Sequence, residues 1–303
     1  MSTTPALRTQ GLELELGKTP ILQGVDMQVY QGDLYGLLGR NGAGKTTTLR
    51  ALLGFLPAYR GQAEVLGTSS RKLHQVPVPI GVALDPPGLD DTLSVRQNLE
   101  LARIRGGIKE GRTVDEVLKL VGLEQRQHNR GDKLSHGQGR RAAVARALLG
   151  NPKILILDEP LSGLDPEGVE QLLHLFKKLA FEEAVTVVLS SHHLREVQEF
   201  CNRVGLVEQG KVILEGATAD LLARTGDSVE LHCEKPQAAQ SFLNQDKAVS
   251  SVESREDGRL IVHLSKEVHL ASFCSRIVQA EVGLDAFTPH RASLMDVFHE
   301  AVS

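Results

Sequence analysis

Residues 39–47 carry the combination of residue types best suited to chemistry in this chain. In order, they are Gly39, Arg40, Asn41, Gly42, Ala43, Gly44, Lys45, Thr46 and Thr47. Their spacing fits the pattern G-x-x-x-x-G-K-[ST], in which glycine lets backbone N–H groups approach phosphate oxygens that a side chain would block. Lys45 can reach the outer phosphates of a nucleotide as a point charge, and the Thr46 hydroxyl can bind Mg²⁺. The segment therefore predicts a phosphate-binding loop.

The segments on either side of this loop predict the elements that position it. Leu34 to Leu38 is a short apolar run typical of a strand, and Thr47 to Phe55 is a good helical segment. A helix that starts at the loop directs the positive end of its dipole at the phosphates. A chance glycine-rich turn is the alternative, and the agreement between motif and flanking elements disfavours it.

A second pair of chemical residues, Asp158 and Glu159, directly follows the apolar run Ile154 to Leu157. Such a run is typical of a strand buried on both faces, and α/β folds bind ligands at strand ends. Asp158 can hold Mg²⁺ through water, and Glu159 can orient or deprotonate an attacking water. The pair alone is weak evidence, with a solvated turn as the alternative, but the phosphate loop earlier in the chain strengthens it.

Two further polar groups lie next to predicted elements. Ser135 and Gly137 precede an arginine-rich helix predicted over 138–149, and they can offer a hydroxyl and backbone N–H groups to an anion. Taken alone, an ordinary capped helix start is the favoured interpretation. His192 follows a strand predicted over 185–189 and can contact a γ-phosphate, although a lone histidine is usually only a satisfied polar group.

The order of apolar and periodic segments predicts an α/β fold. Residues 8–35 resemble strands joined by turns, and leucine alternates with glutamate between Leu12 and Leu16, as in a half-exposed strand. Further strands are expected over 80–84, 154–157 and 185–189, and helices over 94–122, 138–149 and 166–181. This alternation predicts a mostly parallel sheet with helices packed around it. After about Thr225, strand patterns at 228–233 and 259–264 and helical patterns at 236–244 and 267–280 predict a small α+β unit without a catalytic constellation.

Composition narrows the function classes. The net charge of −4, the absence of Trp and an aromatic content of 4% give no basic or stacking surface, so no nucleic-acid partner is expected. Cys201, Cys233 and Cys274 lie far apart without metal spacing, which favours reduced thiols in the cytosol. No apolar run approaches the roughly 20 residues of a membrane span, and the N-terminus lacks the core of a signal peptide.

Taken together, these segments resemble the ATP-binding subunit of an ABC transporter of the drug- and antibiotic-exporting ABC-2 type. The order is GRNGAGKTT at 39–47, LSHGQ at 134–138, ILILDEP at 154–160, SGLD at 162–165 and SSH at 190–192. The resemblance implies a phosphate-loop NTPase sheet with an antiparallel β subdomain and a helical subdomain at about 86–150, all within a cassette over 1–224. Residues 225–303 would form a C-terminal α+β appendix that contacts the dimer or a partner.

The resemblance also implies roles for single residues. The 39–47 loop corresponds to Walker A, Asp158 to the Walker B aspartate, Glu159 to the catalytic glutamate and His192 to the switch histidine. The residues expected to act on ATP held by a second cassette are Ser135, His136, Gly137, Gln138 and Asp165. The implied ligands are ATP and Mg²⁺. The implied partners are a second cassette, as a homodimer, and a multi-span permease encoded as a separate chain, which places this chain at the cytoplasmic, inner face of the cell membrane.

Three residues depart from the family pattern. Asp85 stands where the family usually has Gln, and it can either bind Mg²⁺ or merely cap the following Pro86-Pro87 loop. Leu16 stands near the position of an adenine-stacking aromatic, so we expect weak base selectivity with GTP able to substitute. His136 replaces the usual first glycine of the LSHGQ segment but keeps its N–H, so activity is expected to survive.

The C-terminal stretch from Ala292 to Glu300 resembles the S-L-x-D-V-F tail of exporter cassettes whose membrane partner is a separate chain. Two other functions stay open at this point. One is a soluble ABC-type machine acting on ribosomes or DNA, which the single cassette and the lack of heptads disfavour. The other is a regulatory module in which ATP closes a dimer without useful turnover, which Asp85 and the missing aromatic keep open.

Overall fold

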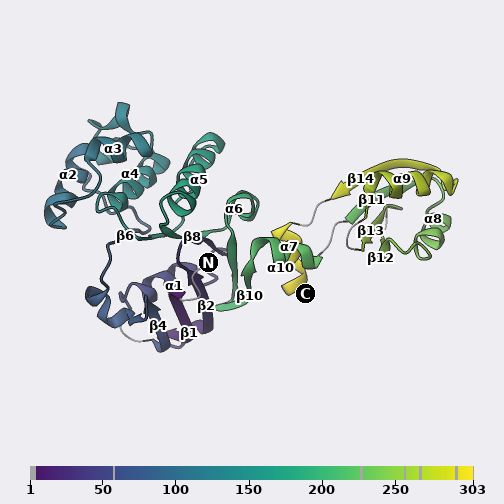
Figure 1. Cartoon of the computed structure of the whole chain (residues 1–303), viewed down its shortest axis with the longest axis horizontal. Coiled ribbons are helices and arrows are strands. Elements are labelled where there is room, and N and C mark those ends of the chain that lie inside the picture. Colours follow the sequence, from purple (N-terminus) through teal and green to yellow (C-terminus); the bar gives the residue numbers. More distant parts are fainter. Residues whose placement is uncertain are drawn as a thin grey trace. The chain divides into compact units, whose positions relative to one another are not determined.

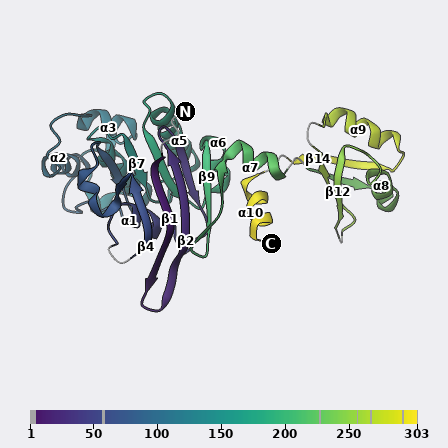
Figure 2. The ribbon, with the colours of Figure 1, turned by 60° about the horizontal axis from the view of Figure 1, so that its bottom comes forward.

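The computed structural model describes residues 5–56, 59–225, 228–255, 257–265, 268–290 and 293–302. The chain divides into two compact units, residues 1–218 with two sheets and residues 219–303 with one, and each unit has its own hydrophobic core. Figure 1 shows the elements of both units, and Figure 2 shows the same ribbon turned. Within the described ranges, no helix combines the length and the apolarity needed to cross a membrane.

The centre of the first unit is a six-stranded sheet in the order β10-β9-β3-β8-β7-β6. Its strands are β3 (Leu34–Leu38), β6 (Ile80–Ala83), β7 (Ile154–Leu157), β8 (Thr186–Ser191), β9 (Arg203–Glu208) and β10 (Lys211–Ala217). Neighbouring strands are parallel except β9 and β10. Every residue of β3, β7 and β8 is buried, as expected for strands covered on both faces. The predicted mostly parallel sheet is confirmed, although the sequence patterns missed β9 and β10.

A second, antiparallel sheet in this unit has the strand order β2-β1-β4-β5. Its strands are β1 (Pro5–Leu16), β2 (Thr19–Tyr30), β4 (Arg60–Val65) and β5 (Thr68–Ser69). Leu12 and Leu14 are buried in one core with residues of β3, whereas Leu16 is 59% exposed. The alternation predicted for β1 is therefore confirmed through Leu14 and fails at the last residue, where the strand runs out of the core.

Helices lie between and beside these strands. They are α1 (Lys45–Leu52), α2 (Val95–Arg105), α3 (Val114–Leu120), α4 (His136–Leu148), α5 (Pro166–Phe181) and α6 (Leu194–Phe200), with short 3₁₀ turns η1 (Ser70–Gln75), η2 (Glu124–Arg126) and η3 (Gly131–Lys133). The predicted α5 is confirmed. The prediction of 47–55 for α1 was wrong at both ends. The helix starts two residues earlier because Gly44 adopts a φ of +110° that lets the loop turn directly into the helix at Lys45, and it ends at Leu52, shortly before Gly54 with its φ of +69°. The start predicted for α4 was two residues late, because the helix begins directly after its N-cap, Ser135, and Gln138 already lies in its first turn as the partner of Ser135 in a capping box.

The second unit is built on an antiparallel sheet in the order β12-β13-β11-β14. Its elements are α7 (Thr218–Thr225), β11 (Ser228–Cys233), α8 (Pro236–Leu243), β12 (Val249–Ser254), β13 (Leu260–Leu264), α9 (Leu270–Gln279), β14 (Leu284–His290) and α10 (Leu294–Val302). Apolar side chains from the sheet, α8 and α9 form its core, including Val229, Ala239 and Phe273. The predicted strand at 228–233 is confirmed, and β12 and β14 were missed. Glu267, where the second helix was predicted to start, and Ala292, the first residue of the tail motif, lie outside the described residues.

Candidate nucleotide site

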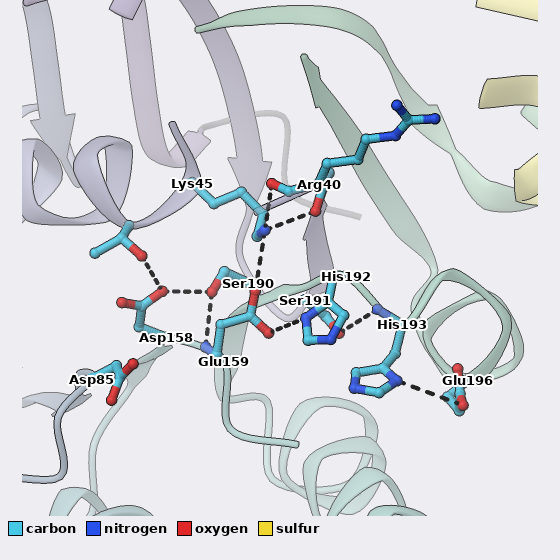
Figure 3. A network of polar contacts seen from close by, with 12 residues as sticks. Arg40, Lys45, Asp85, Asp158, Glu159, Ser190, Ser191, His192, His193 and Glu196 are labelled. Carbon is cyan, nitrogen blue, oxygen red and sulfur yellow. Dashed lines mark hydrogen bonds and ion pairs between the residues drawn. The ribbon is translucent and has the colours of Figure 1, made fainter. Parts of the chain in front are cut away.

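The loop between β3 and α1 folds around the Lys45 side chain. Gly39 has no room for a side chain, because a Cβ there would lie 2.2 Å from the carbonyl oxygen of Val207. Lys45 is the first residue of α1 and is buried. Its Nζ donates to the carbonyl oxygens of Gly39 at 2.7 Å and of Arg40 at 3.1 Å. Figure 3 marks the contact between Lys45 and Arg40. The loop therefore holds a positive charge at the carboxyl end of β3.

Glu159 lies between two basic side chains. Its Oε1 is 3.1 Å from Lys45 Nζ, and its Oε2 is 2.9 Å from His192 Nδ1. The backbone of Glu159 has a φ of +47°, a left-handed conformation that is uncommon outside glycine. This turn after β7 directs the carboxylate toward the loop and toward the end of β8, where His192 lies (Figure 3). A phosphate that binds Lys45 therefore competes directly with Glu159.

Asp158 and Ser190 form a buried pair beside Glu159. The carboxylate Oδ1 of Asp158 accepts hydrogen bonds from Thr46 Oγ1 at 2.9 Å and from Ser190 Oγ at 2.7 Å. The same Ser190 oxygen accepts the backbone N–H of Glu159 at 2.8 Å. Parallel register places these groups together, because Leu157 of β7 pairs with Leu189 of β8. The role of Ser190 was not predicted, although this residue begins the SSH segment and stands two residues before His192.

The chemistry of these oxygens fits Mg²⁺. Asp158 is 1% exposed, and its second oxygen, Oδ2, has no hydrogen-bond partner in the described part of the chain. A buried carboxylate oxygen without a partner is costly unless a ligand satisfies it. Mg²⁺ prefers one or two protein oxygens together with water and substrate phosphates. The described residues contain no group of three or more His, Cys, Asp or Glu side chains placed around a metal, which agrees with such a sparse ligand set. Thr46 and Asp158 are the side chains that could hold the ion.

Asp85 has a partner that the sequence did not predict. Its Oδ1 lies 2.7 Å from a guanidinium nitrogen of Arg140, which is a buried residue of α4. Its backbone carbonyl oxygen accepts a hydrogen bond from Arg50 of α1 at 3.1 Å. Among the described contacts, the Asp85 carboxylate accepts no hydrogen bond that would cap the Pro86-Pro87 loop. The only available signal for Arg140 was the arginine-rich character of α4, and the binding of Mg²⁺ by Asp85 stays a prediction.

These residues line one cleft of about 520 Å³. Its lining comes from the phosphate loop and from residues far apart in the sequence: Leu16, Ile21, Asn41, Gly42, Gly44, Lys45, Thr46, Thr47, Asp85, Arg140, Glu159, Ser162 and His192. Leu16 and Ile21 supply the apolar part of the lining. The base contact predicted at Leu16 would therefore be made by aliphatic side chains, without an aromatic ring from the protein. The cleft thus combines a phosphate-binding loop, carboxylates and an apolar rim.

The LSHGQ residues line a different hollow of about 540 Å³. Ser135, Gly137, Gln138 and Asp165 are among its lining residues, and none of its lining residues is shared with the first cleft. Ser135 Oγ accepts the N–H of Gln138 at 3.2 Å, and Asp165 Oδ1 accepts the N–H of Gly168 at 3.0 Å, so both side chains cap helices. His136 is exposed at the first turn of α4. The structure therefore does not bring these residues to the Lys45 cleft of the same chain.

Comparisons with known proteins agree with this geometry. Residues 22–162 match the family model described as ABC transporter. The chain is 34% identical over 295 residues to the bacitracin transport ATP-binding protein BcrA of Bacillus licheniformis, covering 96% of this chain and 95% of that protein. It is 31% identical over 253 residues to the linearmycin resistance ATP-binding protein LnrL of Bacillus subtilis (strain 168), covering 81% and 80%.

A solved structure supports the same assignment. A dimeric post-hydrolysis state of an ATP-binding cassette with ADP and Pi has a TM-score of 0.62 at 25% identity, and it covers 70% of this chain and 98% of that chain. The expected phosphate-loop NTPase fold is thereby confirmed, as is the expectation of an enzyme that uses ATP with Mg²⁺. The chain belongs to the ABC transporter family, as an ATP-binding subunit that hydrolyses ATP.

Proposed function

We propose that this chain powers an exporter, in which two copies close over two ATP molecules and drive a separate multi-span permease at the inner face of the membrane. The names of two relatives, one in bacitracin transport and one in linearmycin resistance, support the exporter. The observation that supports the dimer is the separation of the two concave surfaces, because the Lys45 cleft and the hollow around Ser135 share no lining residue. A symmetric dimer would join the cleft of each copy to the hollow of the other and form two equivalent sites.

Nucleotide binding starts with Lys45. Its ammonium leaves the carbonyl oxygens of Gly39 and Arg40 and the Glu159 carboxylate for the outer phosphates, which carry more negative charge. The positive end of α1 and the loop N–H groups bind the same phosphates. The Ser135 hydroxyl and the Gly137 N–H of the second copy then complete the site around the γ-phosphate. Binding energy gained across the two copies thereby closes the dimer.

Hydrolysis depends on the carboxylate that Lys45 releases. Glu159, still held by His192, orients a water in line with the γ-phosphorus and takes its proton as the new P–O bond forms and the bond to the β–γ bridging oxygen breaks. Ser190 holds the turn by bonding both the Asp158 carboxylate and the Glu159 N–H. Mg²⁺ bound at Thr46 and Asp158 would neutralise developing charge on the phosphate oxygens. Loss of the γ-phosphate removes the bridge between the copies, and the dimer opens.

The permease would contact the helical part of the cassette. The segment that follows Asp85 leads from the nucleotide cleft into α2 and α3, so a movement at the phosphates can reach those helices. We assign this surface, within about 86–150, to the permease. We assign the C-terminal appendix, residues 225–303, to contacts within the dimer or with the permease.

Co-purification tests this proposal. The tagged chain is extracted from membranes in mild detergent, the proteins that accompany it are identified, and ATPase activity is measured. We expect a multi-span membrane protein and an ATPase activity that Glu159→Gln removes while ATP binding remains. Glu199→Gln, which changes an exposed glutamate of α6, serves as the matched control. Recovery of ribosomal or DNA-associated proteins alone would overturn the exporter.

A further inference from the structure

Arg140 is an unusual residue for the wall of a nucleotide cleft. It lies in the second turn of α4, is only 3% exposed, and lines the same cleft as Lys45 and Glu159. A buried guanidinium without a counter-charge is strongly destabilising. Its one described ion pair is with Asp85, at 2.7 Å, while its Nε and its other terminal nitrogen have no hydrogen-bond partner among the described residues. Asp85 is therefore the residue that compensates Arg140.

The backbone around Asp85 is fastened on two sides. Arg50 of α1 donates to the carbonyl oxygen of Asp85, and Arg146 of α4 donates to the carbonyl oxygens of Pro87 at 2.7 Å and Gly88 at 2.6 Å. Two arginines of α4 thus hold the 85–88 segment: Arg140 binds the side chain of Asp85, and Arg146 binds backbone carbonyl oxygens. These contacts fix the position of the Asp85 backbone next to Arg140.

Charge gives the pair a consequence for nucleotide binding. A triphosphate is strongly anionic, and a lone carboxylate in the wall of this cleft would repel it. The side chain of Asp85 is 48% exposed and lines the cleft. A bound triphosphate would therefore experience its negative charge unless Arg140 offsets it. An uncharged amide at this position would need no such partner. The ion pair with Arg140 is therefore the described contact that offsets the charge of Asp85 beside a nucleotide.

We propose that Arg140 is the positioning residue for Asp85: it holds the carboxylate against α4 and cancels its charge, so that nucleotide affinity depends on the pair. This inference rests on the proposed placement of the nucleotide in the Lys45 cleft. Removing Arg140 alone leaves an uncompensated carboxylate beside the phosphates. Removing the charge of Asp85 alone leaves a guanidinium that attracts them. Removing both restores a neutral wall.

A double-mutant cycle tests the pair through binding. The dissociation constant of a fluorescent, non-hydrolysable ATP analogue is measured, with and without Mg²⁺, for wild type, Arg140→Gln, Asp85→Asn and the double variant. We expect Arg140→Gln to weaken binding about tenfold or more, and the double variant to bind within about threefold of wild type, since contacting charged pairs couple by this much. Asp85→Asn should bind as tightly as wild type or more tightly, in both conditions. Arg140→Lys should recover part of the affinity.

Controls separate the possible failures. Thermal unfolding shows whether each variant is folded, and Arg103→Gln changes an arginine of α2 that does not line the cleft. If the double variant bound the ATP analogue as weakly as Arg140→Gln, the proposed pair would be overturned. Weakened binding by Asp85→Asn that appeared only with Mg²⁺ would also overturn it, because Asp85 would then be a metal ligand. Undiminished binding by Lys45→Ala would instead show that the nucleotide is placed elsewhere. Loss of binding in Lys45→Ala with additive effects of the other two changes would reject only the pair.

Discussion

The cleft around Lys45 and the hollow around Ser135 are both concave and polar, but their polar groups are in opposite states. In the cleft, Lys45 is buried, and Asp158 next to the cleft is buried with one oxygen without a partner in the described part of the chain. In the hollow, Ser135 and Asp165 are helix caps, and each side chain accepts one hydrogen bond from the first turn of its helix. The cleft therefore has charged groups that a ligand can pair with, whereas Ser135 and Asp165 in the hollow already serve as helix caps.

This difference shows how one chain can carry two unequal parts of a site. Buried charges cost free energy unless something pairs with them, so the cleft is built to bind a charged ligand by itself. Capped helix starts are stable without any ligand. They still direct free N–H groups outward, and they can act on an anion only when a second surface brings it to them. A substitution in one of these two surfaces should therefore leave the other surface of the same chain unaffected.

The largest effect is expected from Lys45→Ala, which removes the positive charge of the cleft. Loss of an electrostatic contact to phosphate should lower turnover at least ~100-fold, and it should also weaken ATP binding. Steady-state ATPase assays and titration with a fluorescent ATP analogue measure both. Lys119→Ala, an exposed lysine of α3, should leave both unchanged. Full activity in Lys45→Ala would remove the cleft from the reaction.

Ser135→Arg should block the hollow while sparing the cleft. Because the hollow shares no lining residue with the cleft, ATP binding by the single chain should remain near wild type. Turnover should fall roughly 100-fold, since a contact made to the developing charge is lost. ATPase and binding assays on the same preparation separate the two. A matching loss of ATP affinity in dilute protein would mean that Ser135 acts on the nucleotide of its own chain.

Mixing the two inactive variants sharpens this test. In a dimer of Lys45→Ala with Ser135→Arg, one site carries both changes, and the other site has an unchanged phosphate loop and an unchanged Ser135 hollow. Equal mixtures should therefore regain activity that neither variant shows alone. Two copies that each used their own cleft and hollow would regain nothing. ATPase activity across mixing ratios gives the answer, and mixing either variant with itself is the control.

Ser190→Ala should have an intermediate effect confined to the cleft. It removes one hydrogen bond to Asp158 and the acceptor for the Glu159 N–H. Hydrogen bonds to charged groups contribute about 1.5–3 kcal/mol, so turnover should fall about tenfold or more. Ser190→Thr keeps the hydroxyl and should recover activity if the buried site accepts the extra methyl group. An unchanged kcat in Ser190→Ala would show that the turn after β7 holds Glu159 without it.

The smallest effect is expected from Leu16→Tyr. Leu16 lies at the cleft rim and is 59% exposed, so it can offer a base only apolar contact. An aromatic ring there should add stacking worth about 0.5–1.5 kcal/mol, which is roughly two- to tenfold tighter ATP binding. Competition between ATP and GTP measures selectivity. Leu16→Met, which changes the shape without adding a ring, should leave the affinity for ATP close to that of wild type.

Much of the fold could be predicted because strong local patterns decide it. The apolar runs at β3 and β7 and the helical period of α5 are properties of contiguous residues, and the structure keeps them. The strands that were missed are β4, β5, β9, β10, β12 and β14, and all of them except the buried β9 consist mostly of half-buried or exposed residues. Their conformation depends on pairing with other strands more than on their own sequence. The late prediction for α4 has a different cause, because the start of this helix is fixed by a capping box between two near neighbours, Ser135 and Gln138.

The sequence by itself determined the phosphate loop, the Asp158-Glu159 turn and the LSHGQ helix start, because glycine backbone freedom, strand burial and capping act between near neighbours. Only the tertiary structure decided which groups meet. Parallel register joins Asp158 to Ser190, 32 residues later, and the approach of α4 to the end of β6 joins Arg140 to Asp85. Contacts between distant residues depend on sheet order and helix packing, so no local pattern contains them.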